Sequence, residues 1–401
     1  MFNHIVCRYN EIATKSGNRA MFERRLIDNM RAACADLDTK LKFNRMRGRI
    51  VIYRDQDVEF TPEEKAAISQ RLERCFGLDS FSFCLEGERT MEAVEEMIKK
   101  TVPEMFAPFL EKNGVVQFRT RARRADKRFP GTSKDIEIAA ATIVEKLIGP
   151  GKVKVNLDHP DVSIGIEIRE HNSILYFDSL KAAGGLPVGS NAPMLALLSG
   201  GIDSPVACHM TMKRGCHVDF LTFHSYPYTP RGTVEKVQRI ADLVNQFQTP
   251  RGILYACNIS EIQKLIRDNC DPRYRTVLYR RIMMRIASKL CTEKKRFAIV
   301  TGESIGQVAS QTVENMSVIE KASDYLIVRP LCGFDKNETI RRAEAIGSFE
   351  TSIEPMPDSC TVFAPDSPVL RAKLHTVEYE ESKIPDLENA IQQAYDTMEI
   401  Y

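Results

Sequence analysis

The stretch that most constrains the fold lies near the middle of the chain and reads Leu-Leu-Ser-Gly-Gly-Ile-Asp-Ser-Pro at residues 197–205. The apolar run Met194–Leu198 predicts a buried parallel strand. Two glycines then allow a tight turn, and we expect Ser204 to cap a helix that Pro205 opens. Such a turn points backbone N–H groups and the positive end of a helix dipole at one place, which is a geometry that binds phosphate.

Asp203 distinguishes this turn from an ordinary strand-turn-helix without a ligand, which is the alternative interpretation. A carboxylate beside a phosphate cradle repels the ligand unless a divalent cation bridges them, so Asp203 indicates a nucleotide with Mg²⁺. The loop G-x-x-x-x-G-K-[ST] of kinase-type enzymes is absent from the chain. The pattern S-G-G-x-D-S at 199–204 instead resembles the pyrophosphate loop (PP-loop) of enzymes that split ATP between its α and β phosphates.

Length and composition indicate a reduced protein of several domains. A chain of 401 residues is long enough for two or three domains, and a net charge of +2 restricts nucleic-acid affinity to local patches. The N-terminus has no apolar signal core, and no run approaches a membrane span. The eleven cysteines are irregularly spaced, without a C-x-x-C pair. We therefore expect a cytoplasmic protein without a zinc or iron–sulfur site.

The first part of the chain alternates short strands and amphipathic helices. Strands at 4–9, 42–46 and 49–53, with a helix at 18–34, form a unit too small for a robust core, so we expect it to pack on the next segment of the chain. Thr61 with Glu64 predicts a capping box at the start of the next helix. Beyond it we expect helices at 91–100 and 133–147 and strands at 81–85, 115–121, 153–157, 162–168 and 173–177.

The densest positive patch of the chain lies at 119–128, with six basic residues against one acidic residue. Alternation places Val116 and Phe118 on one face of a strand and the arginines on the other. A solvated strand face is the alternative interpretation. The use of arginine, with Phe129 beside it to stack on bases, favours an RNA backbone. The residues expected to contact RNA are Arg119, Arg121, Arg123, Arg124, Lys127 and Arg128.

The second part of the chain, from residue 191, has a regular α/β alternation. We expect Ser260 and Gln263 to form a capping box. With 194–198, strands at 218–223, 253–257, 297–301 and 325–328 predict five parallel strands, and helices around 233–247, 260–269 and 276–291 cover both faces. Ligands of such sheets lie at the carboxyl ends of the strands, where the phosphate loop points.

Three later stretches carry further polar residues. Arg281 and Arg285 share one helix face, although water-facing helices routinely hold arginines. The stretch 301–312 follows a strand, and its glycines and two glutamines suit close approach to a planar ligand; an ordinary Gly-rich loop is the alternative. Asp335 and Glu338 are a capping-box pair, which puts Lys336 in a first helical turn, where it opposes the dipole and indicates an anionic partner.

The whole chain resembles the tRNA 4-thiouridine synthetases. The resemblance rests on 119–130, 156–161, 167–169, the Gly-rich stretch 184–189 and T-G-E-S-I-G-Q-V-A-S-Q at 301–311. It also includes the family's D-C-C-T-x-F, where Ser359 replaces the first cysteine and Cys360 keeps the shared position. A lone cysteine is usually a small buried hydrophobe, but this one follows the last sheet helix in a Pro-rich loop that we expect at the surface.

The resemblance implies an α/β fold class with three domains. A ferredoxin-like domain is expected at 1–60, an RNA-binding THUMP domain at 61–168, a linker at 169–190 and a PP-loop catalytic domain with a five-stranded parallel sheet at 191–401. It further implies that Asp203, Lys336 and Cys360 are catalytic, with Lys336 stabilising the leaving pyrophosphate. The implied contacts to ATP are Leu197, Leu198, Ser199, Gly200, Gly201, Asp203, Ser204, Thr222, Phe223, Arg280, Gly302 and Gln311.

The implied reaction uses ATP and Mg²⁺ to exchange oxygen for sulfur at C4 of a uridine, expected at position 8 of tRNA. Adenylation makes the carbonyl oxygen a good leaving group. The resemblance also implies a cysteine desulfurase as sulfur donor, a homodimer and no membrane partner. Some family members carry a C-terminal rhodanese domain, for which this sequence leaves no room after Cys360, so we expect sulfur to arrive directly on that thiol. Cys332 is the candidate second thiol, by its predicted proximity.

Three alternatives stay open. The enzyme could thiolate a sulfur-carrier protein for thiazole synthesis. It could use adenylation for another modification of RNA, such as amidation or lysine transfer. It could also be a non-catalytic tRNA-binding protein with a relic loop, although Asp203, Lys336 and Cys360 are intact.

Overall fold

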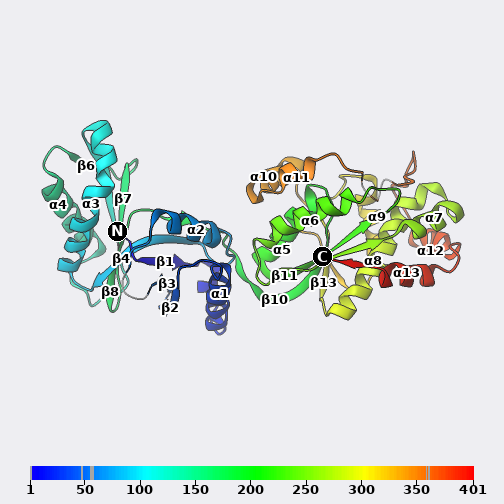
Figure 1. Ribbon diagram of the computed structural model, residues 1–401, viewed down its shortest axis with the longest axis horizontal. Coiled ribbons are helices and arrows are strands. Elements are labelled where there is room, and N and C mark those ends of the chain that lie inside the picture. The colour runs from blue at the N-terminus through cyan, green and yellow to red at the C-terminus, as the bar shows by residue number, and fades with distance from the viewer. Residues whose placement is uncertain (1, 47, 55–57, 358, 360–361) are drawn as a thin grey trace. The chain divides into compact units, whose positions relative to one another are not determined.

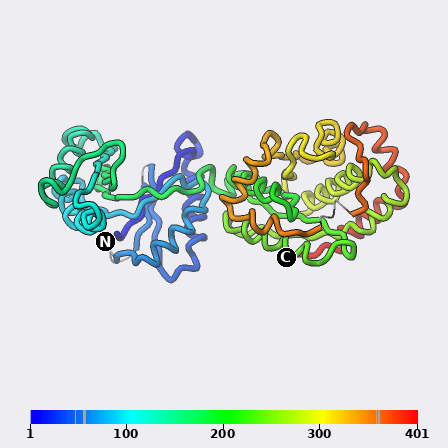
Figure 2. Tube along the Cα trace, turned by 90° about the horizontal axis from the view of Figure 1, so that it is seen from above, coloured from blue at the N-terminus to red at the C-terminus, as the bar shows by residue number. Residues whose placement is uncertain are grey.

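The computed structural model describes residues 2–46, 48–54, 58–357, 359 and 362–401 (Figure 1). The chain divides into two compact units, Met1–Gly185 and Leu186–Tyr401, which the tube in Figure 2 traces in turn. Within the described ranges, none of the helices is both long enough and apolar enough to cross a membrane.

The first unit is built on a single nine-stranded sheet in the order β2-β3-β1-β4-β8-β7-β5-β6, with β9 paired to β4 outside this order. Strand β4 pairs antiparallel with β1 on one side and with β8 on the other. The first sixty residues therefore share their sheet with the following segment, as predicted. The strands are β1 (His4–Arg8), β2 (Lys42–Met46), β3 (Arg49–Tyr53), β4 (Ser80–Glu88), β5 (Val116–Arg124), β6 (Val153–Val155), β7 (Val162–Ile168), β8 (Asn172–Tyr176) and β9 (Leu180–Lys181).

The longest helix of this unit extends well beyond its prediction. Helix α3 (Met91–Asn113) continues past the expected end at residue 100, through Pro103 and Pro108, until Gly114 ends it with φ of 72°. Its buried side chains continue to Phe106, so tertiary packing outweighs the two prolines. The capping box of Thr61 and Glu64 is confirmed. The other helices are α1 (Arg19–Ala33), α2 (Pro62–Glu73) and α4 (Ser133–Ile148).

Strand β5 alternates as predicted. Val116 and Phe118 are buried in a core with residues of α3 and α4. The expectation that Phe129 stacks on RNA bases is wrong, because this ring is 6% exposed and belongs to the same core. The expected linker 169–190 contributes β8 to this sheet and the start of β10 (Leu186–Leu197) to the next one.

Replacing Gly165 with alanine is expected to destabilise the first unit by about 1–3 kcal/mol, the usual cost of overpacking. A Cβ at this position would lie 2.3 Å from the Tyr176 ring, and the Arg8 guanidinium is 4.4 Å from the centroid of that ring. Urea unfolding followed by circular dichroism measures the effect. Gly17→Ala is the control, because its Cβ would meet nothing within 4 Å. Equal stability of the two variants would contradict this packing.

The second unit is a six-stranded sheet in the order β14-β13-β10-β11-β12-β15. The five predicted strands are parallel, as expected. The sixth, β15 (Glu399–Ile400), pairs antiparallel with β12 at one edge and is too short to show a sequence pattern. The parallel strands are β10, β11 (Arg214–His224), β12 (Leu254–Asn258), β13 (Ala298–Val300) and β14 (Leu326–Val328).

Helices cover both faces of this sheet (Figure 1). One face packs on α7 (Ser260–Asn269), α8 (Arg275–Lys294), α9 (Val313–Glu320), α12 (Leu374–Ser382) and α13 (Leu387–Asp396) in one large apolar core. The other carries α5 (Asp203–Lys213) and α6 (Gly232–Asn245), against which α10 (Lys336–Ile346) and α11 (Phe349–Ile353) lie. The expected α/β class with a doubly covered parallel sheet is confirmed.

Two predicted helix caps are wrong. Helix α5 begins at Asp203, two residues earlier than expected, and Ile202 at its N-cap makes no side-chain bond. Helix α7 begins at Ser260 itself, after Ile259, so Ser260 cannot be its cap. In both places the polar side chains serve tertiary contacts instead: Ser204 accepts from Ser199, and Gln263 donates to the Ser359 carbonyl.

Candidate active site

The phosphate loop lies where the strand order of the second sheet reverses. From β10 the chain continues to β11 on one side, while β13 lies on the other. Strand β10 ends at Leu197, which Leu198 follows, and Thr222 and Phe223 lie at the carboxyl end of β11, just before its last residue His224. The loop after β13 begins with Thr301. In open α/β sheets ligands bind at such a switch point, so these ends frame the candidate site.

Two serine hydroxyls hold the phosphate loop in shape. The Ser199 N–H donates to Ser204 Oγ over 2.9 Å, and the Gly201 N–H donates to Ser199 Oγ over 3.3 Å. The Ser204 hydroxyl in turn donates to the Ser199 carbonyl. These bonds tie the loop to the first turn of α5, whose N-terminus carries a partial positive charge.

Gly302 lets the loop after β13 reach the backbone of α5. A Cβ at this position would lie 2.7 Å from the backbone N of Ser204 and 2.9 Å from the carbonyl C of Asp203. No side chain fits at these distances. The expected contact of Gly302 with the nucleotide is thus accompanied by a direct backbone contact with the phosphate loop.

Asp203 is the point where three distant segments meet. Lys336 Nζ donates to both of its carboxylate oxygens, over 2.8 and 3.0 Å, and Gln307 Nε2 donates to one of them over 2.9 Å. The predicted capping box of Asp335 and Glu338 is present and places Lys336 in the first turn of α10. The side chains of Lys336 and Asp203 are 44% and 21% exposed, so a ligand can reach both. Sequence reasoning missed Gln307, although it lies in the conspicuous stretch 301–312.

Glu303 organises the arginines beside this site. Its buried carboxylate accepts from Arg280 Nη1 at 3.0 Å, Arg329 Nε at 2.9 Å and Thr301 Oγ1 at 2.9 Å. The Arg280 Nε is buried without a hydrogen-bond partner among the described residues. Gln311 is also buried, and its Oε1 accepts from the Ser304 N–H at 3.3 Å. Arg329 Nη1 also pairs with Glu320 at 2.7 Å, so two carboxylates balance the two guanidinium groups of this cluster.

Arg281 and Arg285 form ion pairs with the two C-terminal helices, α12 and α13. Arg281 is 5% exposed and forms a bidentate pair with Glu381 of α12, with Nε–Oε1 of 2.7 Å. Arg285 pairs with Glu388 of α13. Their shared face thus binds protein rather than solvent or ligand.

Most of the cysteine thiols are buried, which makes them unsuited to sulfur transfer. Ten cysteines lie in the described part of the chain; nine are buried and Cys332 is partly exposed. Desolvation raises the pKa of Cys270 to about 11 and that of Cys257 to about 12, which keeps these thiols protonated and poorly nucleophilic at neutral pH. Cys360 lies outside the described residues. Burial likewise raises the pKa of Cys7, Cys34, Cys75, Cys84, Cys208, Cys216 and Cys291.

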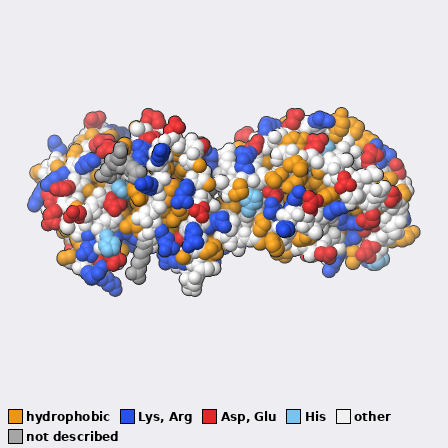
Figure 3. Space-filling model, turned by 60° about the horizontal axis from the view of Figure 1, so that its bottom comes forward, with side chains coloured by type: hydrophobic (Ala, Val, Ile, Leu, Met, Phe, Trp, Pro, Cys, Tyr) orange, Lys and Arg blue, Asp and Glu red, His pale blue; other side chains and the backbone are white. Residues whose placement is uncertain are grey.

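The basic strand β5 presents only some of its arginines. Arg121, Arg123 and Lys127 are exposed. Arg124 donates from Nη1 to the carbonyls of Phe129 and Gly131, and thereby braces its own turn. The two remaining residues of the predicted set also have partners: Arg119 bonds Ser163 at 2.7 Å, and Arg128 bonds Asp126 at 3.0 Å and Glu170 at 3.2 Å. In the view of Figure 3, Lys and Arg side chains on the first unit are interspersed with acidic ones. Binding of a nucleic-acid backbone to this face would therefore depend on individual basic residues.

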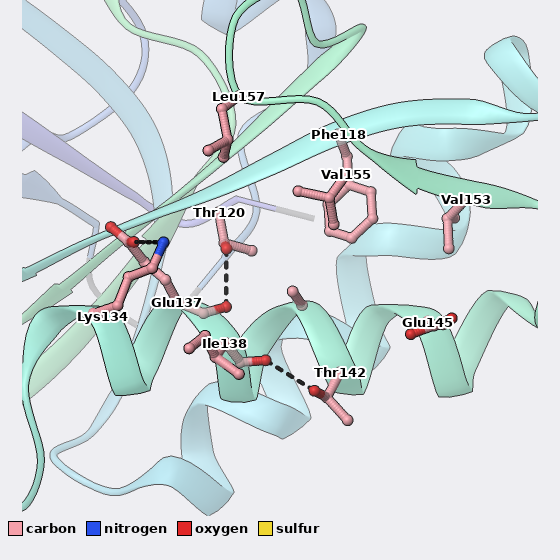
Figure 4. A pocket seen from close by; sticks show the side chains of 11 residues that line it. Phe118, Thr120, Lys134, Glu137, Ile138, Thr142, Glu145, Val153, Val155 and Leu157 are labelled. Carbon is pink, nitrogen blue, oxygen red and sulfur yellow. Dashed lines mark hydrogen bonds and ion pairs between the residues drawn. The ribbon is translucent and has the colours of Figure 1, made fainter.

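Two hollows flank β5. The larger, of about 810 Å³, is lined by Arg119 and Arg121 together with His159, Ser163 and Tyr176. The smaller, of about 310 Å³, lies between α4 and β6 and is lined mainly by apolar side chains such as Ile138, Val155 and Leu157 (Figure 4). Since side chains alternate along a strand, the larger hollow lies on the arginine face. Asp158, Asp161 and Asp178 also line it, so its charge is mixed.

Sequence reasoning also missed a buried arginine cluster in the first unit. Glu167 is 2% exposed, and its carboxylate binds Arg8 at 3.3 Å, Arg49 at 3.1 Å and Arg169 at 3.1 Å. Three guanidinium groups thus surround one buried carboxylate. It lies on the same face as Arg123, whose register partner on β7 is Glu167. No local pattern reveals it, because its members come from three separate segments.

Comparison with known proteins covers the whole chain. A family described as "Thiamine biosynthesis protein (ThiI)" matches residues 189–385, its ferredoxin-like domain matches 4–82, and the THUMP domain matches 88–178. A probable tRNA sulfurtransferase of Alkaliphilus oremlandii is 38% identical over 400 residues, covering 100% of this chain and 98% of that protein. Its counterpart in Finegoldia magna is 37% identical, covering 99% and 98%.

A solved structure agrees with these matches. A 4-thiouridine synthetase in complex with RNA and bound ATP superposes with a TM-score of 0.87 at 33% identity, over 100% of this chain and 99% of that one. Sequence families, full-length relatives and fold thus point to the same group. The chain therefore belongs to the ThiI family, the tRNA sulfurtransferases.

Proposed function

We propose that this chain uses ATP to adenylate O4 of a tRNA uridine, at position 8, and then replaces that oxygen with sulfur to give 4-thiouridine. The observation that carries the proposal is the meeting of the phosphate loop, Asp203 and Lys336 at the switch point of the parallel sheet. The names of the relatives and the RNA and ATP of the similar structure support it.

In the first step, the uridine O4 attacks the α-phosphorus of ATP, and the bond to the β-phosphate breaks. The electron pair leaves with pyrophosphate, which the loop 199–204 and the N-terminus of α5 hold. Asp203 fits Mg²⁺, which proteins usually bind through one or two carboxylates together with substrate phosphates. Lys336, already bonded to Asp203, is placed to neutralise the developing charge.

In the second step, the terminal sulfur of a Cys360 persulfide attacks C4, and AMP leaves with O4 and its electron pair. A second thiolate then attacks the Cys360 sulfur, which releases 4-thiouridine and forms a disulfide. An added thiol reductant restores both thiols. We assign the second thiol to Cys332, the one cysteine in the described ranges that is not buried, and the persulfide donor to a cysteine desulfurase.

Replacing Cys360 with serine is expected to abolish 4-thiouridine while pyrophosphate is still released, because only the second step needs the thiol. Without an added thiol reductant, Cys332→Ser is expected to stop with the uridine bound to Cys360 through a disulfide, so that no 4-thiouridine is released. Cys270→Ser is the control, since that thiol is buried and protonated. Quench-flow with nucleoside mass spectrometry measures both yields. Repeated turnover by Cys332→Ser would contradict its role.

The proposed function is tested with unmodified tRNA, ATP, Mg²⁺, a cysteine desulfurase and cysteine. We expect the near-ultraviolet absorption of 4-thiouridine to appear and the mass of one uridine to change by the exchange of oxygen for sulfur. A homodimer, in which one subunit holds tRNA for the active site of the other, is part of the proposal; light scattering measures its mass. AMP release without a thiolated nucleoside would contradict the proposal.

Thiolation of a sulfur-carrier protein is a second candidate function, because the matching family is described as "Thiamine biosynthesis protein (ThiI)". The same adenylation would then occur at a protein carboxylate. Complementation of a thiamine-requiring strain distinguishes the two: growth without 4-thiouridine in tRNA would favour the carrier protein.

Replacing Arg121 and Arg123 with glutamine is expected to weaken tRNA binding and to lower the slope of log K against log salt by about 1 per arginine, since each releases counterions from one phosphate. Both side chains are exposed on β5. Arg31→Gln is the charge-matched control, because this exposed arginine lies on α1 and pairs with Asp28. Fluorescence anisotropy at several salt concentrations measures the slope, and equal slopes would contradict the interface.

A further inference from the structure

The two carboxylate oxygens of Asp203 are hydrogen-bonded unequally. Oδ2 accepts from Lys336 Nζ over 3.0 Å and from Gln307 Nε2 over 2.9 Å. Among the described residues, Oδ1 accepts only from Lys336, over 2.8 Å. A carboxylate has roughly four lone-pair positions, divided equally between its oxygens. Both positions of Oδ2 are therefore filled, and Oδ1 keeps one that can bind a metal ion.

The two donors to Asp203 differ in charge, which decides how each responds to a metal ion there. The ammonium of Lys336 repels a divalent cation at the same carboxylate and is attracted by the phosphates of a bound nucleotide. The side-chain amide of Gln307 is neutral and donates without this repulsion. We therefore expect Gln307 to keep its bond to Oδ2 when a nucleotide and a cation bind, while Lys336 turns to the phosphates.

The backbone that carries Gln307 is fixed by the loop that leads into α10. Ser304 Oγ donates to the Phe334 carbonyl over 2.8 Å. The Ile305 N–H donates to the Cys332 carbonyl over 3.2 Å. The loop after β13 and the loop before α10 are thus bonded to each other, and each supplies one donor to the same carboxylate.

We propose that Gln307 is a positioning residue, which orients Asp203 so that Oδ1 binds the divalent cation of the nucleotide. This inference rests on the proposed function, in which the Asp203 carboxylate fits Mg²⁺. Hydrogen-bond partners of a metal-binding side chain typically change metal affinity by about 10- to 100-fold when they are removed. Gln307 acts through the carboxylate, so its loss should weaken metal binding, and excess metal should restore pyrophosphate release.

The test compares Gln307→Met with Gln246→Met. The first removes the amide at similar length, and the second removes an exposed amide at the C-terminal end of α6. Mn²⁺ is titrated into protein with α,β-methylene ATP, without tRNA or a sulfur donor, and electron paramagnetic resonance measures the bound metal. We expect the Kd for Mn²⁺ to rise about tenfold in Gln307→Met and to be unchanged in Gln246→Met. An unchanged Kd in Gln307→Met would overturn the inference.

The dependence of pyrophosphate release on Mg²⁺ gives a second readout, which a purely structural role does not move. In Gln307→Met we expect the Mg²⁺ concentration for half-maximal release to rise about tenfold while the maximal rate is retained. A lower maximal rate that excess Mg²⁺ does not restore would overturn the inference.

Gln307→Lys tests whether the donor must be neutral. This variant keeps a donor but adds a positive charge beside the cation, so we expect it to bind Mn²⁺ more weakly than the wild type. Wild-type affinity in Gln307→Lys would overturn the inference, as would a wild type that binds no Mn²⁺ with the analogue. A wild type that binds Mn²⁺ as expected but never thiolates tRNA would instead overturn the proposed function.

Discussion

Replacing Lys336 with methionine is expected to lower the rate of pyrophosphate release from ATP and tRNA by roughly 100- to 1000-fold, the usual effect of removing one group that stabilises transition-state charge. The reason is its place: Nζ lies 2.8 and 3.0 Å from the two carboxylate oxygens of Asp203, at the N-terminal turn of α10, where a cation otherwise opposes the helix dipole. Rapid-quench measurement of pyrophosphate at saturating ATP isolates this step.

Arg341→Met is the matched control for this variant. Arg341 lies on the same helix, is exposed and donates from Nε to the Asn337 carbonyl of its own helix at 3.2 Å. We expect it to release pyrophosphate at the wild-type rate. If Lys336→Met also kept that rate, Lys336 would have no part in adenylation, and the assignment of the leaving-group charge would be wrong.

Replacing Gly302 with alanine is expected to weaken ATP binding. The new Cβ would lie 2.7 Å from the Ser204 backbone N, so the phosphate loop or the loop after β13 must move. Overpacking costs about 1–3 kcal/mol. If this cost destabilises the ATP-bound state relative to the free protein, the Kd for ATP rises roughly 5- to 150-fold. Isothermal titration with α,β-methylene ATP measures the Kd.

Gly333→Ala is the control for Gly302→Ala. Gly333 lies in the loop before α10, and a Cβ there would meet no atom within 4 Å. We expect it to bind ATP as the wild type does. Equal affinity of the two variants would mean that the close contact between Gly302 and the phosphate loop does not shape the nucleotide site.

Sequence patterns correctly predicted those elements that depend only on residues close together in the chain. Strands β2 and β3 match their predicted bounds, because each is a short run ended by turn residues. The capping box at Asp335 is present because it needs only residues three positions apart. The order of the parallel strands brought the loops after β10 and β13 to one edge, so the site could be placed approximately.

Features that depend on tertiary packing could not be predicted from the sequence. Phe129 is buried rather than free to stack, and α3 passes two prolines because its apolar face continues. The bond between Asp203 and Lys336 joins residues that no local pattern relates. The same holds for Gln307 on Asp203 and for the arginines around Glu167. Such partners are set by the folded arrangement of loops.

Oxygen labelling tests directly whether O4 of the uridine is activated by adenylation. tRNA carrying ¹⁸O at O4 of the target uridine would be thiolated in unlabelled water, and the AMP analysed by mass spectrometry. We expect one ¹⁸O in the phosphate of each AMP, because the C4–O4 bond breaks while the bond from O4 to phosphorus stays. Unlabelled AMP formed together with 4-thiouridine would contradict it.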